Sequence, residues 1–62
     1  MITKFYKVTK GSYKNPVLLA SKNISCIPAK GTYIEFSGQV FIVENIVFNI
    51  DTLEYRIALT RI

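Results

Sequence analysis

The sequence contains no histidine and no tryptophan, and its single cysteine is Cys26. One cysteine excludes a disulfide within the chain and indicates a reducing compartment, for which the cytoplasm is the expected location. The usual ligands of a structural zinc ion are missing as well. We therefore expect no metal and no cofactor, and we expect Cys26 to be a small buried apolar residue.

The residue types that carry most enzyme chemistry are also scarce. Without histidine the chain lacks the side chain that most often moves protons near neutral pH. The three glycines stand far apart in turns and form no phosphate-binding loop. The acids fit outward strand or turn positions better than a catalytic carboxylate pair; they are Glu35, Glu44, Asp51 and Glu54. We expect a protein that is not an enzyme and has no catalytic residues.

Long apolar runs are absent too. The longest has four residues, whereas a membrane helix needs roughly 20. The first ten residues, MITKFYKVTK, mix lysines with apolar residues rather than placing them ahead of an apolar core, so they do not resemble a signal peptide. We expect a soluble, cytoplasmic protein with no membrane partner.

Strand-forming residues dominate what is present. The 62 residues allow one domain, 1–62, and no segment shows a sustained helical apolar period. Isoleucine, valine, threonine, phenylalanine and tyrosine recur instead, which predicts an all-β fold. We expect strands over 2–9, 17–27, 32–36, 39–50 and 55–61, with residues 17–27 forming one bent strand or two short ones. The first reads as a lysine-bearing edge strand, and residues 17–23 fit either a strand or a single helical turn.

The connections are predicted from turn-forming residues. Residues 10–16, KGSYKNP, read as a loop, and residues 28–31, PAKG, read as a turn. Ser37–Gly38 is typical of a two-residue hairpin turn, and residues 51–54 form the last turn. The result is five short strands, which we expect to pair in an antiparallel sheet.

The segment QVFIVENIVFNI, residues 39–50, is apolar on both of its faces. A half-buried strand should alternate apolar and polar side chains. Glu44 and Asn45 interrupt the apolar run, and a bulge at this place would let the strand bend. A long bent strand in the middle of five predicts a sheet that curls into a small barrel.

A spaced pattern over residues 24–62 resembles small SH3-like β-barrels. Its members are Pro28, Gly31, Ile34, Phe36, Gly38, Phe41, Val43 and Val47. The resemblance implies a five-stranded antiparallel SH3-like barrel with a long bent central strand. Many very small phage and bacterial proteins are similar, which implies a phage-type accessory protein that binds or inhibits a host protein. The missing tryptophan departs from the aromatic groove with which SH3 domains hold polyproline peptides.

The two apolar faces of residues 39–50 predict an interface. One face fills the barrel, and the other would be an exposed apolar patch unless the N-terminal segment covers it. The outward row is either Val40 and Ile42 or Phe41 and Val43, and periodicity leaves this choice open. We expect a homo-oligomer, a dimer or higher, that binds a protein partner through this surface; its candidate residues are Val40, Phe41, Ile42, Val43 and Val47.

Charge offers an alternative function. Residues 1–31 carry six lysines and no acid, whereas residues 32–62 carry four acids and two arginines. Lysines interleaved with aromatic rings can bind nucleic acid or a nucleotide, because cations neutralise phosphates and rings stack on bases. Equally, such lysines can keep an apolar protein soluble and protect a strand edge. The candidate anion-binding residues are Lys4, Tyr6, Lys7, Lys10, Tyr13 and Lys14.

Overall fold

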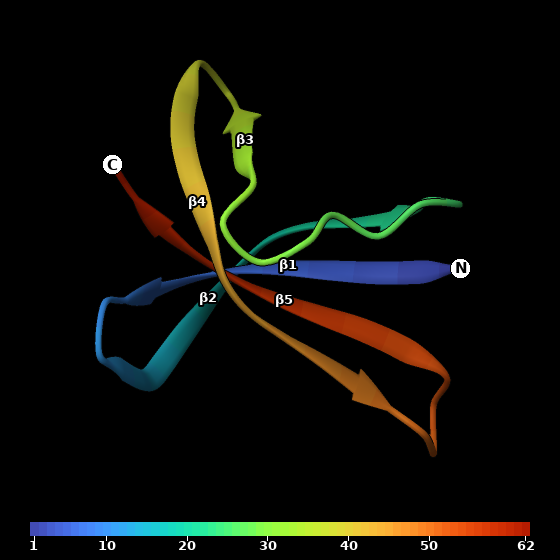
Figure 1. The fold of residues 1–62 in the computed structure, drawn as a ribbon. Coiled ribbons are helices and arrows are strands. Elements are labelled where there is room, and N and C mark those ends of the chain that lie inside the picture. Colours follow the sequence, from blue (N-terminus) through green and yellow to red (C-terminus); the bar gives the residue numbers. More distant parts are fainter.

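A computed structural model describes the backbone of residues 1–62 and every side chain except that of Tyr13. Five strands make up the fold (Figure 1): β1 (Ile2–Thr9), β2 (Ser12–Asn23), β3 (Tyr33–Phe36), β4 (Gln39–Asn49) and β5 (Glu54–Arg61). The described backbone contains no helix, which confirms the all-β prediction. Accordingly, no helix with the length and apolar character of a membrane crossing occurs among the described residues.

The strands form one mixed sheet in the order β2-β1-β5-β4-β3. Three neighbouring pairs are antiparallel, but β1 and β5 run parallel, with Thr3 opposite Tyr55 and Lys7 opposite Leu59. The expectation of a purely antiparallel sheet is therefore wrong. So is the placement of β1 at an edge, because β2 and β5 pair with it on either side. Its Lys4 lies on the outer face, where a charged side chain reaches water from an inner strand as easily as from an edge strand.

The sheet curls into a half-barrel that stays open between β2 and β3. The strands cross one another at steep angles in Figure 1, as expected for a small and strongly twisted sheet. The long strand of residues 39–50 becomes β4, between β5 and β3, so the central strand of the sheet is β5. The curl leaves one concave inner face, which holds the core, and one convex outer face.

A bulge in β4 explains why residues 39–50 have apolar residues at both odd and even positions. The pairing with β5 passes from Val43–Leu59 to Asn45–Ala58, so Glu44 is an extra residue on β4. An extra residue shifts the alternation of side chains by one position. Odd-numbered Phe41 and Val43 therefore share the inner face with even-numbered Ile46. The predicted bulge at Glu44–Asn45 is confirmed.

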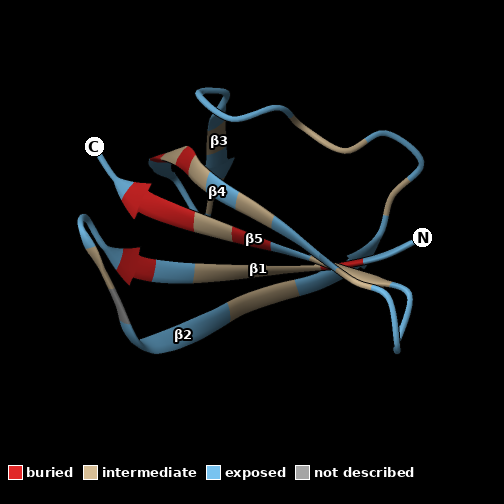
Figure 2. Ribbon diagram, turned by 60° about the horizontal axis from the view of Figure 1, so that its bottom comes forward, coloured by how far each residue is buried: buried red, intermediate tan, exposed pale blue. Residues whose placement is uncertain are grey.

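The core is small and lies on the inner face of β4 and β5. Four buried apolar residues form it, namely Phe41, Val43, Ile57 and Leu59. Partly buried side chains from the rest of the chain pack around them; these are Phe5, Leu19, Ile27, Ile34, Phe36 and Ile46. Figure 2 shows buried segments on β1, β4 and β5, while most of β2 is exposed. Such a core gives a 62-residue domain a narrow stability margin.

Strand β2 begins earlier than the sequence indicates. The predicted loop over residues 10–16 is wrong, because only Lys10 and Gly11 separate the paired residues Thr9 and Ser12. Gly11 has a φ of 79°, which a glycine adopts without strain. Pro16 is tolerated within β2 because it lies in an irregularity of the β1–β2 ladder, where the pairing passes from Lys7–Val17 to Thr9–Ser12 and Asn15 has a φ of 53°. Residues 17–23 are strand, so the alternative of a helical turn is wrong as well.

The connection between β2 and β3 is irregular rather than a continued strand. It is fixed to β4, since the Gly31 amide donates to the Val43 carbonyl at 2.9 Å and the Val43 amide donates to the Thr32 carbonyl at 2.9 Å. Ile27 packs against the core. Cys26 is exposed, so the expectation of a buried thiol is wrong.

The β3–β4 turn agrees with the sequence. Ser37 and Gly38, with φ of 51° and 76°, join the paired residues Phe36 and Gln39. Positive φ at both positions is what a two-residue type I′ hairpin requires. The prediction of a tight hairpin at Ser37–Gly38 is confirmed.

Candidate functional site

The structure decides which row of β4 faces outward. Phe41 and Val43 are each 1% exposed and belong to the core, whereas Val40 is 44% exposed and Val47 is 52% exposed. Ile42 is half-buried on the same face as Val40. A partner can thus reach Val40, Ile42 and Val47, but not Phe41 or Val43. The N-terminal segment leaves Val40 uncovered, because it forms β1 on the far side of β5.

Three neighbouring strands extend this exposed row at one end of the sheet. Tyr33 of β3 pairs with Ile42, and the Ile62 amide donates to the Val40 carbonyl at 3.2 Å. Paired residues in neighbouring strands share a face, so their side chains are neighbours. Tyr33, Val40 and Ile62 are all exposed. We call Tyr33, Val40, Ile42 and Ile62 the outer patch. The exposed Glu35 pairs with Val40 and so places a carboxylate beside this patch.

Val47 lies apart from the outer patch, because Glu44 and Asn45 stand between them on the outer face. It borders a shallow groove of about 320 Å³ on that face, where Tyr6, Val8 and Pro16 also line the wall. The groove includes Arg56 and Asn45 and is therefore more polar than the outer patch. The predicted interface residues thus divide between the core, the outer patch and this groove.

The candidate anion-binding residues do not gather on one face. Lys4 lies beside Glu54, with 3.4 Å between its Nζ and the Glu54 Oε1, and it shares the outer face with Tyr6. Lys7 belongs to the opposite face of β1, because residues three apart in a strand point to opposite sides. Lys10 lies in the β1–β2 turn and Lys14 on β2. The side chain of Tyr13 lies outside the described residues.

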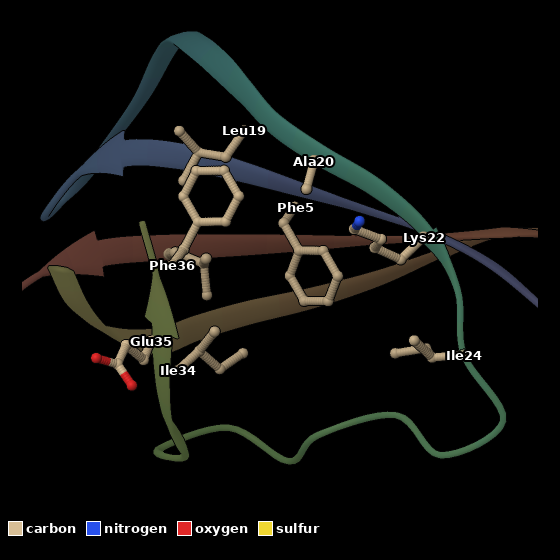
Figure 3. A pocket seen from close by; sticks show the side chains of 9 residues that line it. Phe5, Leu19, Ala20, Lys22, Ile24, Ile34, Glu35 and Phe36 are labelled. Carbon is tan, nitrogen blue, oxygen red and sulfur yellow. The ribbon is translucent and has the colours of Figure 1, made fainter. Parts of the chain in front are cut away.

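A cavity that the sequence did not indicate lies between the free edges of β2 and β3 (Figure 3). Its volume is about 230 Å³. Side chains line it from both edges, from the inner strands and from the irregular connection; they are Phe5, Leu19, Ala20, Lys22, Ile24, Ile34, Glu35, Phe36 and Leu59. Its lining is almost wholly apolar, apart from Lys22 and Glu35.

A bulge in β2 shapes this cavity. The pairing with β1 passes from Phe5–Ala20 to Tyr6–Leu18, so Leu19 is an extra residue. Leu19 and Ala20 therefore line the same cavity although they are adjacent in sequence. The break of alternation in VLLA, residues 17–20, was the one sequence signal for this arrangement.

Comparisons of the chain with models of protein families, with curated proteins and with solved structures find no match. The structure itself offers three surfaces for a partner. These are the outer patch, the groove beside Val47 and the cavity between the two sheet edges. The first is the most exposed and the third is the most enclosed.

Proposed function

We propose that the protein is a non-enzymatic binding module that self-associates and binds protein through the outer patch. The exposure of Val40, next to Phe41 in the core, carries this proposal. Apolar side chains that remain in water on a folded protein mark an interaction surface when they are contiguous. Tyr33 and Ile62 extend the surface across three strands, and an aromatic residue at its margin is typical of protein interfaces.

Self-association through this patch has a simple geometry. A twofold axis brings the patch against its own copy, so the apolar side chains of both copies lie in one shared interface, with Glu35 beside Val40 at its margin. Burial of apolar surface contributes roughly 25 cal/mol per Å², and association stabilises the folded state by mass action. A domain with so few buried residues gains more from this contribution than a larger one. A kinship with SH3-like barrels and a role as a phage-type inhibitor of a host protein stay predictions.

Size-exclusion chromatography with light scattering tests the proposal. We expect a mass near twice the 7.1 kDa of the chain at high protein concentration, falling toward one chain on dilution. The double substitution Tyr33→Thr and Val40→Thr should shift the protein to one chain throughout, because it removes apolar surface from the patch. Threonine keeps the β-branched shape that suits a strand, so the fold should persist.

Val17→Thr is the matched control, since Val17 is exposed on β2 and lies outside the patch. It should leave the mass unchanged. A wild-type protein that stays a single chain at the highest attainable concentration would refute self-association. A Tyr33→Thr, Val40→Thr variant that still dimerises would place the interface elsewhere.

A further inference from the structure

The half-barrel is open along one side, and both sides of the opening are strand edges. Strands β2 and β3 stand at the two ends of the sheet order, and the ladders found among the described residues do not join them. An edge strand presents backbone N–H and C=O groups that a further strand can pair with. β2 is the longer template, because its residues 17–23, beyond Asn15 and Pro16, still outnumber the four residues of β3.

The cavity behind this opening has the size for side chains rather than for a large ligand. Its volume of about 230 Å³ is below the roughly 300–1,000 Å³ of pockets that bury drug-sized molecules. A cavity of about 150 Å³ holds one benzene ring, so this one has room for about two apolar side chains. Figure 3 shows the Phe5 ring, Ile34 and Ile24 surrounding the space. These walls offer apolar contact from both edges.

The positive charge at the opening favours an acidic partner. Lys22 lines the cavity at one end of β2, and Figure 3 shows its nitrogen turned toward the Phe5 ring, whereas the Glu35 carboxylate is turned away from the cavity. Lys14 lies on the same strand, β2. Among the described residues the one ion pair is that of Lys4 with Glu54, which leaves Lys22 free for a carboxylate of a partner.

We propose that the opening between β2 and β3 binds an extended acidic segment of a partner protein as a sixth strand. The segment pairs with the edge of β2, places two apolar side chains at alternate positions into the cavity, and sets a carboxylate beside Lys22. Backbone hydrogen bonds supply affinity in such strand addition, and pockets for alternate side chains supply specificity. The site lies on the inner side of the sheet, so it does not depend on the outer patch.

A second copy of the chain suits the opening less well than an acidic segment. Pairing two β2 edges would bring Lys14 and Lys22 of both copies into one ladder, where like charges destabilise neighbouring strands. Lysines on a strand edge are a recognised means of discouraging such self-pairing. The same lysines attract a strand that carries carboxylates.

Nuclear magnetic resonance titration with short synthetic peptides tests the site. The probe is a capped peptide of sequence Asp-Val-Thr-Val-Thr-Asp, and its matched control replaces both aspartates by lysine. We expect the acidic probe to shift the amide signals of Leu19, Ala20 and Ile34 and to bind about tenfold more tightly than the control at low salt. Replacing the central threonine of the probe by proline should weaken binding, because proline cannot donate to a ladder.

Two variants separate binding from folding. Ala20→Val adds apolar volume inside the cavity. It should keep or raise the midpoint of thermal unfolding and lower the affinity for the acidic probe about tenfold. Ala29→Val is its control, since Ala29 is exposed outside the cavity. Lys22→Glu should reverse the preference, so that the lysine peptide binds more tightly than the acidic one.

Three outcomes would overturn the proposal. The first is an acidic probe that shifts no signals of β2 or β3, or that shifts those of Val40 and Tyr33 instead. The second is a Lys22→Glu variant with unchanged peptide preference. The third is a concentration-dependent shift of Leu19 and Ala20 without any peptide, which would assign the edge to a second copy. Association through the β2 edge would persist in the Tyr33→Thr, Val40→Thr variant, whereas association through the outer patch would be lost, so the two proposals fail separately.

Discussion

The Thr60 hydroxyl donates a hydrogen bond to the Glu44 carboxylate, with 3.2 Å between Oγ1 and Oε2. Thr60 is only 5% exposed, and Glu44 is the extra residue that creates the bulge in β4. The residue that shifts the alternation of β4 thus also satisfies a nearly buried hydroxyl on its neighbour. Position 44 therefore has two separable roles, one in the backbone and one in the side chain.

The side-chain role predicts that Glu44→Ala lowers the free energy of unfolding by about 1 kcal/mol, because the Thr60 hydroxyl loses its acceptor. Glu44→Gln keeps an acceptor oxygen and should lose less than half of that. Urea unfolding followed by circular dichroism measures both. Equal losses for the two variants would show that the hydrogen bond contributes nothing.

The backbone role predicts a much larger effect when Glu44 is deleted. Without the extra residue, either Phe41 and Val43 or Ile46 must turn outward, because a one-residue slip reverses every side chain beyond it. We expect the deletion variant to lack a cooperative unfolding transition. A folded deletion variant with native-like chemical shifts would contradict the assigned register.

The backbone of Leu53 is strained, and a substitution there can stabilise the fold. It has a φ of 58° in the β4–β5 turn, and its side chain is 60% exposed. The left-handed region costs a branched L-residue about 1–2 kcal/mol, which exceeds the entropic cost of a glycine. Leu53→Gly should therefore raise the free energy of unfolding by about 0.5 kcal/mol. Thr52→Gly, where φ is not positive, should lower it, and the opposite ranking in thermal unfolding would contradict this turn geometry.

Cys26 should react without unfolding. Its exposure in the β2–β3 connection predicts that an aromatic disulfide reagent modifies one thiol per chain in native buffer. The rate should lie within about tenfold of that in denaturant, since access then limits neither reaction. Absorbance of the released thiolate measures it. A thiol that reacts only after denaturation would show Cys26 to be covered.

The lysines should give weak nucleic-acid binding at most. Lys4 is engaged with Glu54, and Lys7 belongs to the other face of β1. We expect the affinity for a single-stranded oligonucleotide, measured by fluorescence anisotropy between about 50 and 200 mM salt, to fall with a logarithmic slope shallower than about −2. A steeper slope in the wild-type protein would support the anion-binding alternative if it became shallow in the triple variant Lys7→Ala, Lys10→Ala, Lys14→Ala.

The features that the sequence predicts well are those set by local chemistry. Ser37 and Gly38 define a hairpin because few residues accept a positive φ. Glu44 and Asn45 mark the bulge because they interrupt an apolar run. The alternation of Tyr55, Ile57 and Leu59 identifies the inner face of β5, where Ile57 and Leu59 are buried. Each of these signals is contained within a few neighbouring residues.

The features that it predicts poorly depend on distant parts of the chain. The neighbours of β1 follow from pairs such as Thr3 with Tyr55, and no local pattern encodes them. Asn15 and Pro16 are turn formers, but a break in the β1–β2 ladder, where Asn15 has a φ of 53°, accommodates them within β2. In the last turn the side chain of Asn49, which lies outside the predicted turn residues 51–54, accepts the backbone amides of Asp51 and Thr52 at 2.9 and 3.2 Å. The cavity exists only because β2 and β3 do not meet.

The parallel seam between β1 and β5 has a consequence for synthesis of the protein. The hairpin of β1 and β2 is synthesised before β5, the strand that must dock beside it. Until then the inner side of β1, including Phe5, lacks Ile57 and Leu59 as packing partners. Contacts between residues this far apart in sequence slow folding, so the pairing of β1 with β5 should be completed only after β5 has been synthesised.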